Sequence, residues 1–304
     1  MQIMQRITIS KEGPQFSRIA LGFWRLNEWK MNTSQTLDLM EKAIELGITT
    51  FDHADIYGGY TCEEMFGKAL SEKPSLRENM EIVTKCGICL VSENRPKNHF
   101  HGYDTSKKHI LKSVETSLKN LNTDYLDVLL IHRPDPLMNA QEVAEAFTLL
   151  RESGKVKHFG VSNFLPAQFN LLQHSLDFPL VTNQVEVSVL KMDTLHDGTL
   201  DQCQQLGISP MAWSPLGGGE LFSGNSEKNI RLRNELQKIG EELGGASVDQ
   251  VALAWLLRHP SQIVPVLGTG NIARIKSAAE SVNLELSRDQ WFRIWSASAG
   301  VEVP

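Results

Sequence analysis

The sequence predicts an α/β protein built as a (β/α)8 TIM barrel, with a β-hairpin in front of the barrel and an extra helix at the carboxyl end. Two observations favour this fold class. Short runs rich in valine, isoleucine and leucine alternate with longer segments of helical period, which is typical of parallel strands covered by helices. After the hairpin, eight strand–helix units can be counted, and eight such units close a parallel barrel. A doubly wound open sheet uses the same alternation and is the competing architecture.

The elements follow from local patterns taken in chain order. Residues 4–10 and 16–24 have strand character, and the turn-forming residues KEGP between them predict a hairpin. Further strands are predicted at 49–56, 80–87, 125–132, 156–163, 180–187, 208–216 and 263–270. Helices are predicted at 34–47, 62–72, 105–121, 140–154, 166–176, 199–207, 229–259 with a break near Gly244 and Gly245, 272–281 and 287–298. In the last helix, Trp291 and Trp295 are expected to pack as a core pair.

Composition places the chain among ordinary globular proteins. Of 304 residues, 41% are hydrophobic and 22% charged, and we expect a single domain over 1–304. A formal net charge of -6 argues against nucleic acid as a partner. No apolar run approaches the ~18 residues of a membrane span, and the amino terminus lacks a signal-peptide core. Four cysteines are too few for a disulfide scaffold, so a reduced, cytoplasmic location is expected.

Four reactive side chains stand where predicted strands end. Asp52, Lys85 and His132 each close a strand, and Tyr57 follows Asp52 by five residues. In a barrel these strand ends meet on one rim, where active sites form. Taken singly, each residue has an ordinary structural explanation, such as a lysine reaching for water. Their joint placement on consecutive strands is what indicates a catalytic site.

The chemistry of such a set is specific. Tyrosine has an ordinary pKa of about 10, and a nearby ammonium favours the phenolate and is expected to lower that pKa. A carboxylate would keep the lysine charged, and a histidine would orient a carbonyl by hydrogen bonding. Together these groups would protonate a carbonyl oxygen. No side chain donates hydride, so the set implies a nicotinamide cofactor.

Six motifs occur in this order and spacing: FDHADIYGG, IVTK, LLIH, GVSNF, NQVEV and WSPLGGG. Together they resemble the aldo-keto reductases, in particular the bacterial oxidoreductase branch, from Leu21 to the final helix. The resemblance implies a barrel whose amino-terminal hairpin closes the bottom. It also implies NADPH-dependent reduction of a small aldehyde or ketone to an alcohol by direct hydride transfer. The catalytic tetrad would be Asp52, Tyr57, Lys85 and His132, with Tyr57 as the general acid.

The resemblance also implies a cofactor site assembled from several loops. Its predicted members are Gly22, Phe23 and Trp24 after the first barrel strand, Ser162, Asn163 and Gln184 at the carboxamide, Trp213 on the nicotinamide ring, Ser214, Leu216, Gly217 and Gly218 at the pyrophosphate, and Gly268, Thr269, Gly270 and Arg274 at the adenosine 2′-phosphate. Four positions depart from the family pattern. Trp213 stands where tyrosine is common, Gly268 where many relatives have lysine, and Ser277 with Ala278 where they have Glu-Asn. The strength of the preference for NADPH over NADH therefore stays open.

The segment GTGNIA, residues 268–273, formally matches the dinucleotide fingerprint of Rossmann folds. That fingerprint should open a fold, and here only 31 residues follow Ala273. Phosphate binding by this segment does not require a Rossmann fold, because a glycine turn at a helix amino terminus presents backbone amides to a phosphate in any fold. We therefore expect this loop to bind phosphate inside a barrel.

Other signals and alternatives carry less weight. The pair Cys86 and Cys89 has metal-ligand spacing but no second pair, so no metal site is predicted. A lyase that forms a Schiff base on Lys85 is one alternative, and a nicotinamide-binding regulatory subunit with slow turnover is another. The identity of the substrate and the oligomeric state cannot be deduced from the sequence.

Overall fold

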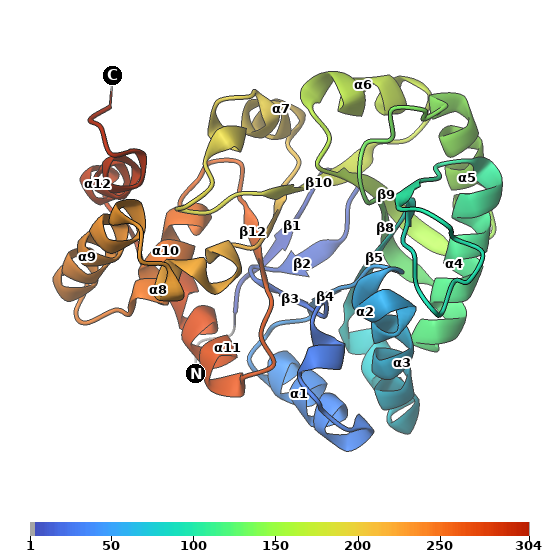
Figure 1. Cartoon of the computed structure of the whole chain (residues 1–304), viewed down its shortest axis with the longest axis horizontal. Coiled ribbons are helices and arrows are strands. Elements are labelled where there is room, and N and C mark those ends of the chain that lie inside the picture. Colours follow the sequence, from blue (N-terminus) through green and yellow to red (C-terminus); the bar gives the residue numbers. More distant parts are fainter. Residues whose placement is uncertain (1–3, 304) are drawn as a thin grey trace.

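The computed structural model describes residues 4–303, in which eight parallel strands close into a barrel with helices around it (Figure 1). The barrel strands are, in chain order, β3 (Ala20–Gly22), β4 (Thr50–Asp52), β5 (Glu81–Cys86), β8 (Leu126–Ile131), β9 (Val156–Ser162), β10 (Leu180–Glu186), β11 (Met211–Trp213) and β12 (Val264–Leu267), and β12 pairs with β3 to close the ring. The surrounding helices are α1 (Thr33–Glu45), α3 (Cys62–Glu72), α4 (Lys107–Leu121), α5 (Ala140–Glu152), α6 (Pro166–His174), α7 (Thr199–Leu206), α10 (Val248–Leu257) and α11 (Ile272–Glu280). The predicted barrel is confirmed.

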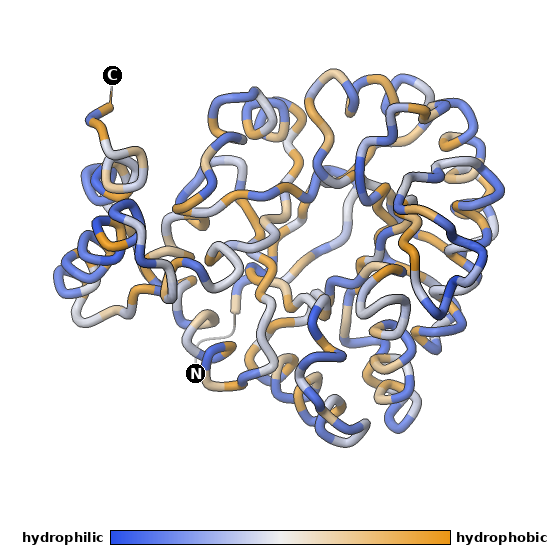
Figure 2. Tube along the Cα trace, viewed as in Figure 1, coloured by the Kyte–Doolittle hydropathy of each residue, from blue (hydrophilic) through white to orange (hydrophobic). Residues whose placement is uncertain are grey.

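The arrangement follows from where the apolar side chains go. Every residue of β8 is buried, because a barrel strand faces packed side chains on the inside and helices on the outside. The tube in Figure 2 shows hydrophobic segments along the strands and hydrophilic ones on the outer helices. Helix α4 buries Ile110, Val114, Leu118 and Leu121 and turns its charged residues to solvent.

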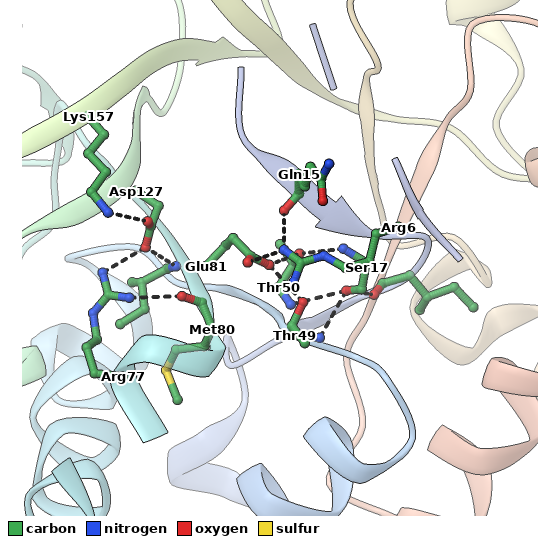
Figure 3. Close-up of polar contacts among 12 residues, drawn as sticks. Arg6, Gln15, Ser17, Thr49, Thr50, Arg77, Met80, Glu81, Asp127 and Lys157 are labelled. Carbon is green, nitrogen blue, oxygen red and sulfur yellow. Dashed lines mark hydrogen bonds and ion pairs between the residues drawn. The ribbon is translucent and has the colours of Figure 1, made fainter. Parts of the chain in front are cut away.

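A β-hairpin of β1 (Arg6–Thr8) and β2 (Gln15–Ser17) lies at the amino-terminal end of the barrel. Its residues Ile9 and Phe16 are fully buried in one cluster with residues from inside the barrel. Polar contacts hold it in place (Figure 3): Arg6 pairs with Glu81 at the start of β5, and Thr49 Oγ1 donates to Glu81 Oε2 at 2.8 Å. The hairpin therefore closes this end of the barrel.

A second polar cluster in Figure 3 fixes the start of β5 and β8. Arg77, in the 3-10 helix η2 (Pro74–Asn79), donates to Asp127 Oδ2 at 2.7 Å and to the Met80 carbonyl at 2.9 Å. The backbone N–H of Ile82 donates to the same carboxylate oxygen at 2.9 Å. The cluster is nearly buried, so it sets the register of the strand that carries Lys85 at its far end.

Additional elements lie outside the eight strand–helix units. They are α2 (Tyr57–Tyr60), the hairpin of β6 (Ile88–Cys89) and β7 (Gly102–Tyr103), α8 (Glu220–Ser223), α9 (Glu227–Glu242), α12 (Arg288–Ala299) and the 3-10 helices η1 (Leu26–Glu28), η3 (Asp193–Leu195), η4 (Gly217–Gly219) and η5 (Ser281–Asn283). The helical segment 229–259 breaks at Gly244 and Gly245, as predicted, and separates α9 from α10. Helices α9 and α12 lie side by side outside the barrel (Figure 1).

Three expectations differ from the structure. The predicted strand 16–24 is two strands, because the chain leaves the hairpin at Ser17 and enters the barrel at Ala20. The predicted strand 49–56 ends at Asp52, after which the chain becomes a loop of the rim. The third concerns Trp291 and Trp295: both pack against one hydrophobic core, but the ring stacked on Trp291 is that of Trp255, with centroids 4.8 Å apart. No helix within residues 4–303 is long and apolar enough to cross a membrane.

Candidate active site

The four predicted catalytic side chains lie together at the carboxyl end of the barrel. Lys85 Nζ lies 2.8 and 2.9 Å from the two carboxylate oxygens of Asp52 and donates to Tyr57 Oη at 3.1 Å. It also donates to the His53 carbonyl at 2.6 Å. The rings of Tyr57 and His132 have centroids 5.9 Å apart and meet nearly edge to face. A fully buried ammonium thus joins the carboxylate to the phenol.

The placement of Tyr57 depends on two glycines that sequence reasoning did not single out. Gly58 and Gly59 have φ angles of 60° and 64° in the short turn of α2, a region that only glycine enters without strain. A Cβ at Gly58 would also come within 2.6 Å of Cys62 Sγ. The glycine pair therefore lets the chain turn sharply after Tyr57 and keep the phenol beside Lys85.

The protonation state of Lys85 results from opposing effects. Burial lowers the pKa of the ammonium, but the Asp52 carboxylate and the Tyr57 phenol raise it further, so its pKa lies above the ordinary value. Lys85 is consequently charged at neutral pH and forms a buried ion pair with Asp52.

For Tyr57, the expected lowering of the pKa is not what the structure gives. Burial raises the pKa of the phenol above its ordinary value of 10.0; Lys85 lowers it in part, and Asp52 raises it again. The sequence shows that a charge lies nearby, but it does not show the cost of placing a phenolate in a buried position. The phenol is therefore protonated at neutral pH, which is the state that a proton donor needs.

His132 follows β8 directly and is neutral. Burial, with the charges of Lys85 and Arg133, lowers the pKa of the imidazole well below 6.5. Its Nδ1 is buried and has no hydrogen-bond partner among residues 4–303. A neutral imidazole carries one N–H group, so this side chain is suited to donate a hydrogen bond to a carbonyl oxygen and not to add a charge.

The residues predicted at the nicotinamide form one hydrogen-bonded chain. Ser162 Oγ donates to the Gln184 carbonyl at 2.9 Å, and Asn163 Nδ2 donates to Ser162 Oγ at 2.8 Å. Trp213 Nε1 donates to Asn163 Oδ1 at 2.9 Å. Gln184 Nε2 in turn donates to Asp52 Oδ1 at 2.7 Å, which links this chain to Lys85. The structure thus brings these four side chains to the tetrad.

The glycine loop after β11 has a shape that fits a phosphate group. Gly217, Gly218 and Gly219 have φ angles of 62°, 63° and 104°, beside Leu216, and Ser214 has a φ of 50°. The Leu190 side chain lies against Gly217, where a Cβ would come within 2.6 Å of Leu190 Cδ1, but a Cβ at Gly219 would meet nothing within 4 Å and one at Gly218 would lie 3.8 Å from Arg25 Nη2. An open run of glycine backbone with an arginine facing it is the kind of cradle that binds phosphate oxygens.

At the predicted 2′-phosphate loop the structure corrects one expectation. The side chain of Asn271 already accepts the backbone N–H groups of Ala273 and Arg274, at 2.9 and 3.2 Å. These two amides were expected to be free for a phosphate, but they are already bonded to the N-cap side chain of α11. The Arg274 side chain is exposed and makes no ion pair within the described residues 4–303. A Cβ at Gly268 would meet nothing within 4 Å, so the loop is open on that side.

The first barrel loop contributes aromatic side chains to the site. Gly22 ends β3, and a Cβ there would lie 2.9 Å from Val266 Cγ1. Phe23 is buried and stacks on His53, with centroids 4.9 Å apart. Trp24 is 54% exposed and lies 6.4 Å from Tyr57, ring centroid to ring centroid. Trp24 therefore forms part of the rim beside the reactive phenol.

Two features of the site gave no usable signal in the sequence. His53 is fully buried, and neither ring nitrogen has a partner among the described residues 4–303. Arg133, next to His132, places its guanidinium carbon 5.4 Å from the centre of the Trp213 ring.

Cys86 and Cys89 are free thiols, and within residues 4–303 no group of histidine, cysteine and acidic side chains is arranged to hold a metal ion.

The barrel and its rim of lysine, carboxylate, tyrosine and histidine define a class of oxidoreductases. The chain belongs to the aldo/keto reductase family, whose sequence profile matches residues 18–299. It is 55% identical to oxidoreductase YdhF of Escherichia coli over 302 residues, covering 99% of this chain and 100% of that protein. It is 47% identical to a 6-dehydroglucose reductase of Agrobacterium fabrum, again covering 99% and 100%.

The fold has solved counterparts in the same family. An aldo/keto reductase from Klebsiella pneumoniae, in complex with NADP and acetate, superimposes with a TM-score of 0.76 at 26% identity. The match covers 94% of each chain.

Proposed function

We propose that this oxidoreductase uses NADPH to reduce a small aldehyde or ketone to an alcohol, by direct hydride transfer with Tyr57 as general acid. The observation that carries the proposal is the position of Lys85 Nζ, which contacts both Asp52 and Tyr57 Oη in a buried site. A protonated phenol held by an ammonium is a proton donor whose anion is stabilised as it forms. The NADP in the Klebsiella relative and the name of the Agrobacterium relative support this reading.

The chain's residues fit a nicotinamide cofactor. Asn163, Ser162 and Gln184 would hold the carboxamide, Trp213 the ring, Gly217 with Gly218 the pyrophosphate, and Arg274 the 2′-phosphate, all at the loops described above. The cofactor supplies hydride to the carbonyl carbon. A tryptophan offers a flat ring face for stacking as well as a tyrosine does.

The roles of the protein groups follow from their geometry. Tyr57 Oη gives its proton to the carbonyl oxygen as the carbon receives hydride, so the two electrons of the C=O π bond become the new O–H bond. Lys85 stabilises the phenolate left behind, and Asp52 keeps Lys85 charged and in place. His132, being neutral, donates a hydrogen bond that orients the carbonyl oxygen.

The Schiff-base alternative is weakened by the same site. A lysine must lose its proton to attack a carbonyl, yet Asp52 and Tyr57 hold the pKa of Lys85 above its ordinary value in spite of burial. The ammonium is also fully buried, which leaves no room for a covalent adduct without breaking the ion pair.

Replacing the phenol tests the proposal. Tyr57→Phe keeps the ring and removes the proton donor, so we expect kcat for carbonyl reduction to fall by ~10²–10⁴-fold while the Kd for NADPH changes less than about twofold. Tyr125→Phe is the matched control, because Tyr125 lies at the opposite end of the barrel beside Arg77. NADPH oxidation with a panel of aldehydes and a fluorescence titration of NADPH provide both numbers. Unchanged kcat in Tyr57→Phe would refute the role of Tyr57, and tight NADPH binding without any turnover by the wild type would favour a regulatory subunit.

A further inference from the structure

Arg133 is a half-buried arginine at the mouth of the site whose guanidinium contacts no hydrogen-bond acceptor among the described residues. Within residues 4–303 it takes part in no side-chain hydrogen bond and no ion pair, and its guanidinium carbon lies over the Trp213 ring, 5.4 Å from the ring centre. Several other buried or half-buried arginines do have such partners: Arg77 with Asp127, Arg233 with the Gly224 carbonyl, and Arg293 with Glu235.

This environment is costly without a ligand. Arginine is charged at any physiological pH and offers five N–H donors in a planar fork. Removing part of that fork from water without acceptors costs free energy, so the arrangement is suited to acceptors that arrive with a ligand. The guanidinium carbon lies over the Trp213 ring, 5.4 Å from its centre, and this cation–π contact keeps the group at the site. The planar fork of an arginine is suited to two-point binding of oxygen atoms.

The location of Arg133 indicates which ligand this is. Arg133 directly follows His132, and the Cα atoms of adjacent residues are about 3.8 Å apart. The charge of Arg133 is also among the causes that lower the pKa of His132, after burial and Lys85, so the guanidinium lies close enough to the imidazole to affect it. Arg25 is the other half-buried arginine without a partner in residues 4–303, but it lies over Trp24 and against Gly218, on the side of the predicted pyrophosphate loop.

We propose that Arg133 is a specificity-determining residue that binds acceptor oxygens of the substrate, from a hydroxyl or a carboxylate close to the carbonyl group. The inference rests on the proposed carbonyl reductase function. In this arrangement His132 holds the carbonyl oxygen while Arg133 holds the neighbouring oxygens. The enzyme therefore prefers hydroxyaldehydes or oxo acids to alkyl aldehydes of similar size.

The experiment compares three small aldehydes that carry an alkyl chain, hydroxyls or a carboxylate: butanal, glyceraldehyde and succinic semialdehyde. We expect Arg133→Met to lower kcat/KM at least about tenfold, or about 1.4 kcal/mol, for one or both polar aldehydes. Butanal and the Kd for NADPH should change less than about twofold. Loss confined to glyceraldehyde identifies hydroxyl recognition, and loss confined to succinic semialdehyde identifies carboxylate recognition.

A matched control is Arg151→Met, because the guanidinium of Arg151 also lies over an aromatic ring, that of Phe178 at 4.5 Å, but Arg151 is exposed and lies in the last turn of α5, at the far end of the barrel. It should change none of these values. Equal losses for all three aldehydes in Arg133→Met, or no loss for any, would overturn the inference. A weaker Kd for NADPH with unchanged discrimination among aldehydes would assign Arg133 to the cofactor instead.

A binding measurement separates failure of this inference from failure of the proposed function. Tryptophan fluorescence is titrated with glycerate, which carries both kinds of acceptor oxygen and cannot be reduced at an aldehyde. Saturable quenching in the wild type that disappears in Arg133→Met supports the inference even if no aldehyde is turned over. Identical titrations of the two proteins would refute it even if the wild type reduces aldehydes.

Discussion

At the scale of single residues, the protonation state of each catalytic side chain is set by its burial and by the charges of its neighbours. Lys85 is charged because Asp52 and Tyr57 outweigh the effect of burial on its pKa. Tyr57 is protonated because burial outweighs the effect of Lys85 on its pKa. His132 is neutral because burial and two positive neighbours act in the same direction. Each protonation state thus depends on depth in the barrel as much as on residue type.

Removing Lys85 should therefore affect stability as well as activity. Lys85→Met leaves the Asp52 carboxylate, which is 3% exposed, without its counterion. Breaking a buried ion pair from one side costs about 3–5 kcal/mol, and we expect a loss of that order in the free energy of unfolding in urea. The double variant Asp52→Asn/Lys85→Met should regain a large part of it, because no charge is left buried. Both variants should lack reductase activity; equal stability of the single and double variants would contradict this account.

At the scale of elements, helix α11 shows how a cap competes with a ligand. The N-cap residue Asn271 satisfies the amides of Ala273 and Arg274, which is the usual role of asparagine at this position. The helix start is then stable by itself, and its remaining attraction for an anion comes from the dipole and the Arg274 side chain. Cofactor discrimination at this loop should depend chiefly on that side chain.

Arg274→Ala tests this point. NADPH differs from NADH by the 2′-phosphate, so loss of a charge-assisted contact should weaken NADPH binding by about 1.5–3 kcal/mol and leave NADH binding almost unchanged. Lys276→Ala, two residues further in the same helix, is the control and should have a smaller effect. The prediction is tested by measuring the dissociation constants of both cofactors for wild type and variants at one salt concentration. Equal weakening of the two cofactors would exclude Arg274 as the residue that recognises the 2′-phosphate.

At the scale of the whole molecule, the catalytic end of the barrel contains buried ionisable groups that couple stability to pH. His53 is packed between Phe23 and Phe66, with ring centroids 4.9 and 4.4 Å away. Burial, and to a lesser degree the charge of Lys85, lowers the pKa of its imidazole from 6.5 to about 3. The folded protein therefore keeps His53 neutral over a pH range in which the unfolded chain takes up a proton.

The sign of the effect follows from linkage. Between pH 6.5 and about 3 the unfolded state binds one more proton at residue 53 than the folded state, so stability falls as the pH falls below 6.5. From pH 7 to pH 5 this contribution amounts to about 2 kcal/mol. We expect wild type to lose that much more unfolding free energy over this interval than His53→Leu. The exposed His99→Leu serves as control and should follow the wild type; parallel curves for wild type and His53→Leu would contradict the prediction.

Much of the fold was predictable because burial patterns are local. The runs at residues 125–132 and 156–163 are strands in the structure, and the helical faces at 105–121 and 287–298 are helices. The short hairpin of β6 and β7 was missed, because its residues carry no alternating pattern and its pairing joins segments twelve or more residues apart. The core position of Trp291 was predictable from its helix, but its stacking partner was not, because Trp255 is 36 residues away in sequence.

For the site, the sequence by itself determined the barrel and the identity of the side chains that reach its rim, because strand ends are set by periodicity and the four residue types can be read directly. Tertiary structure alone decided their electrostatic state. The raised pKa of Tyr57, the neutral His132 and the unpartnered guanidinium of Arg133 all depend on how much water each group loses and which charges lie beside it. Those quantities are sums over atoms that come from distant segments of the chain, and no local pattern of residues contains them.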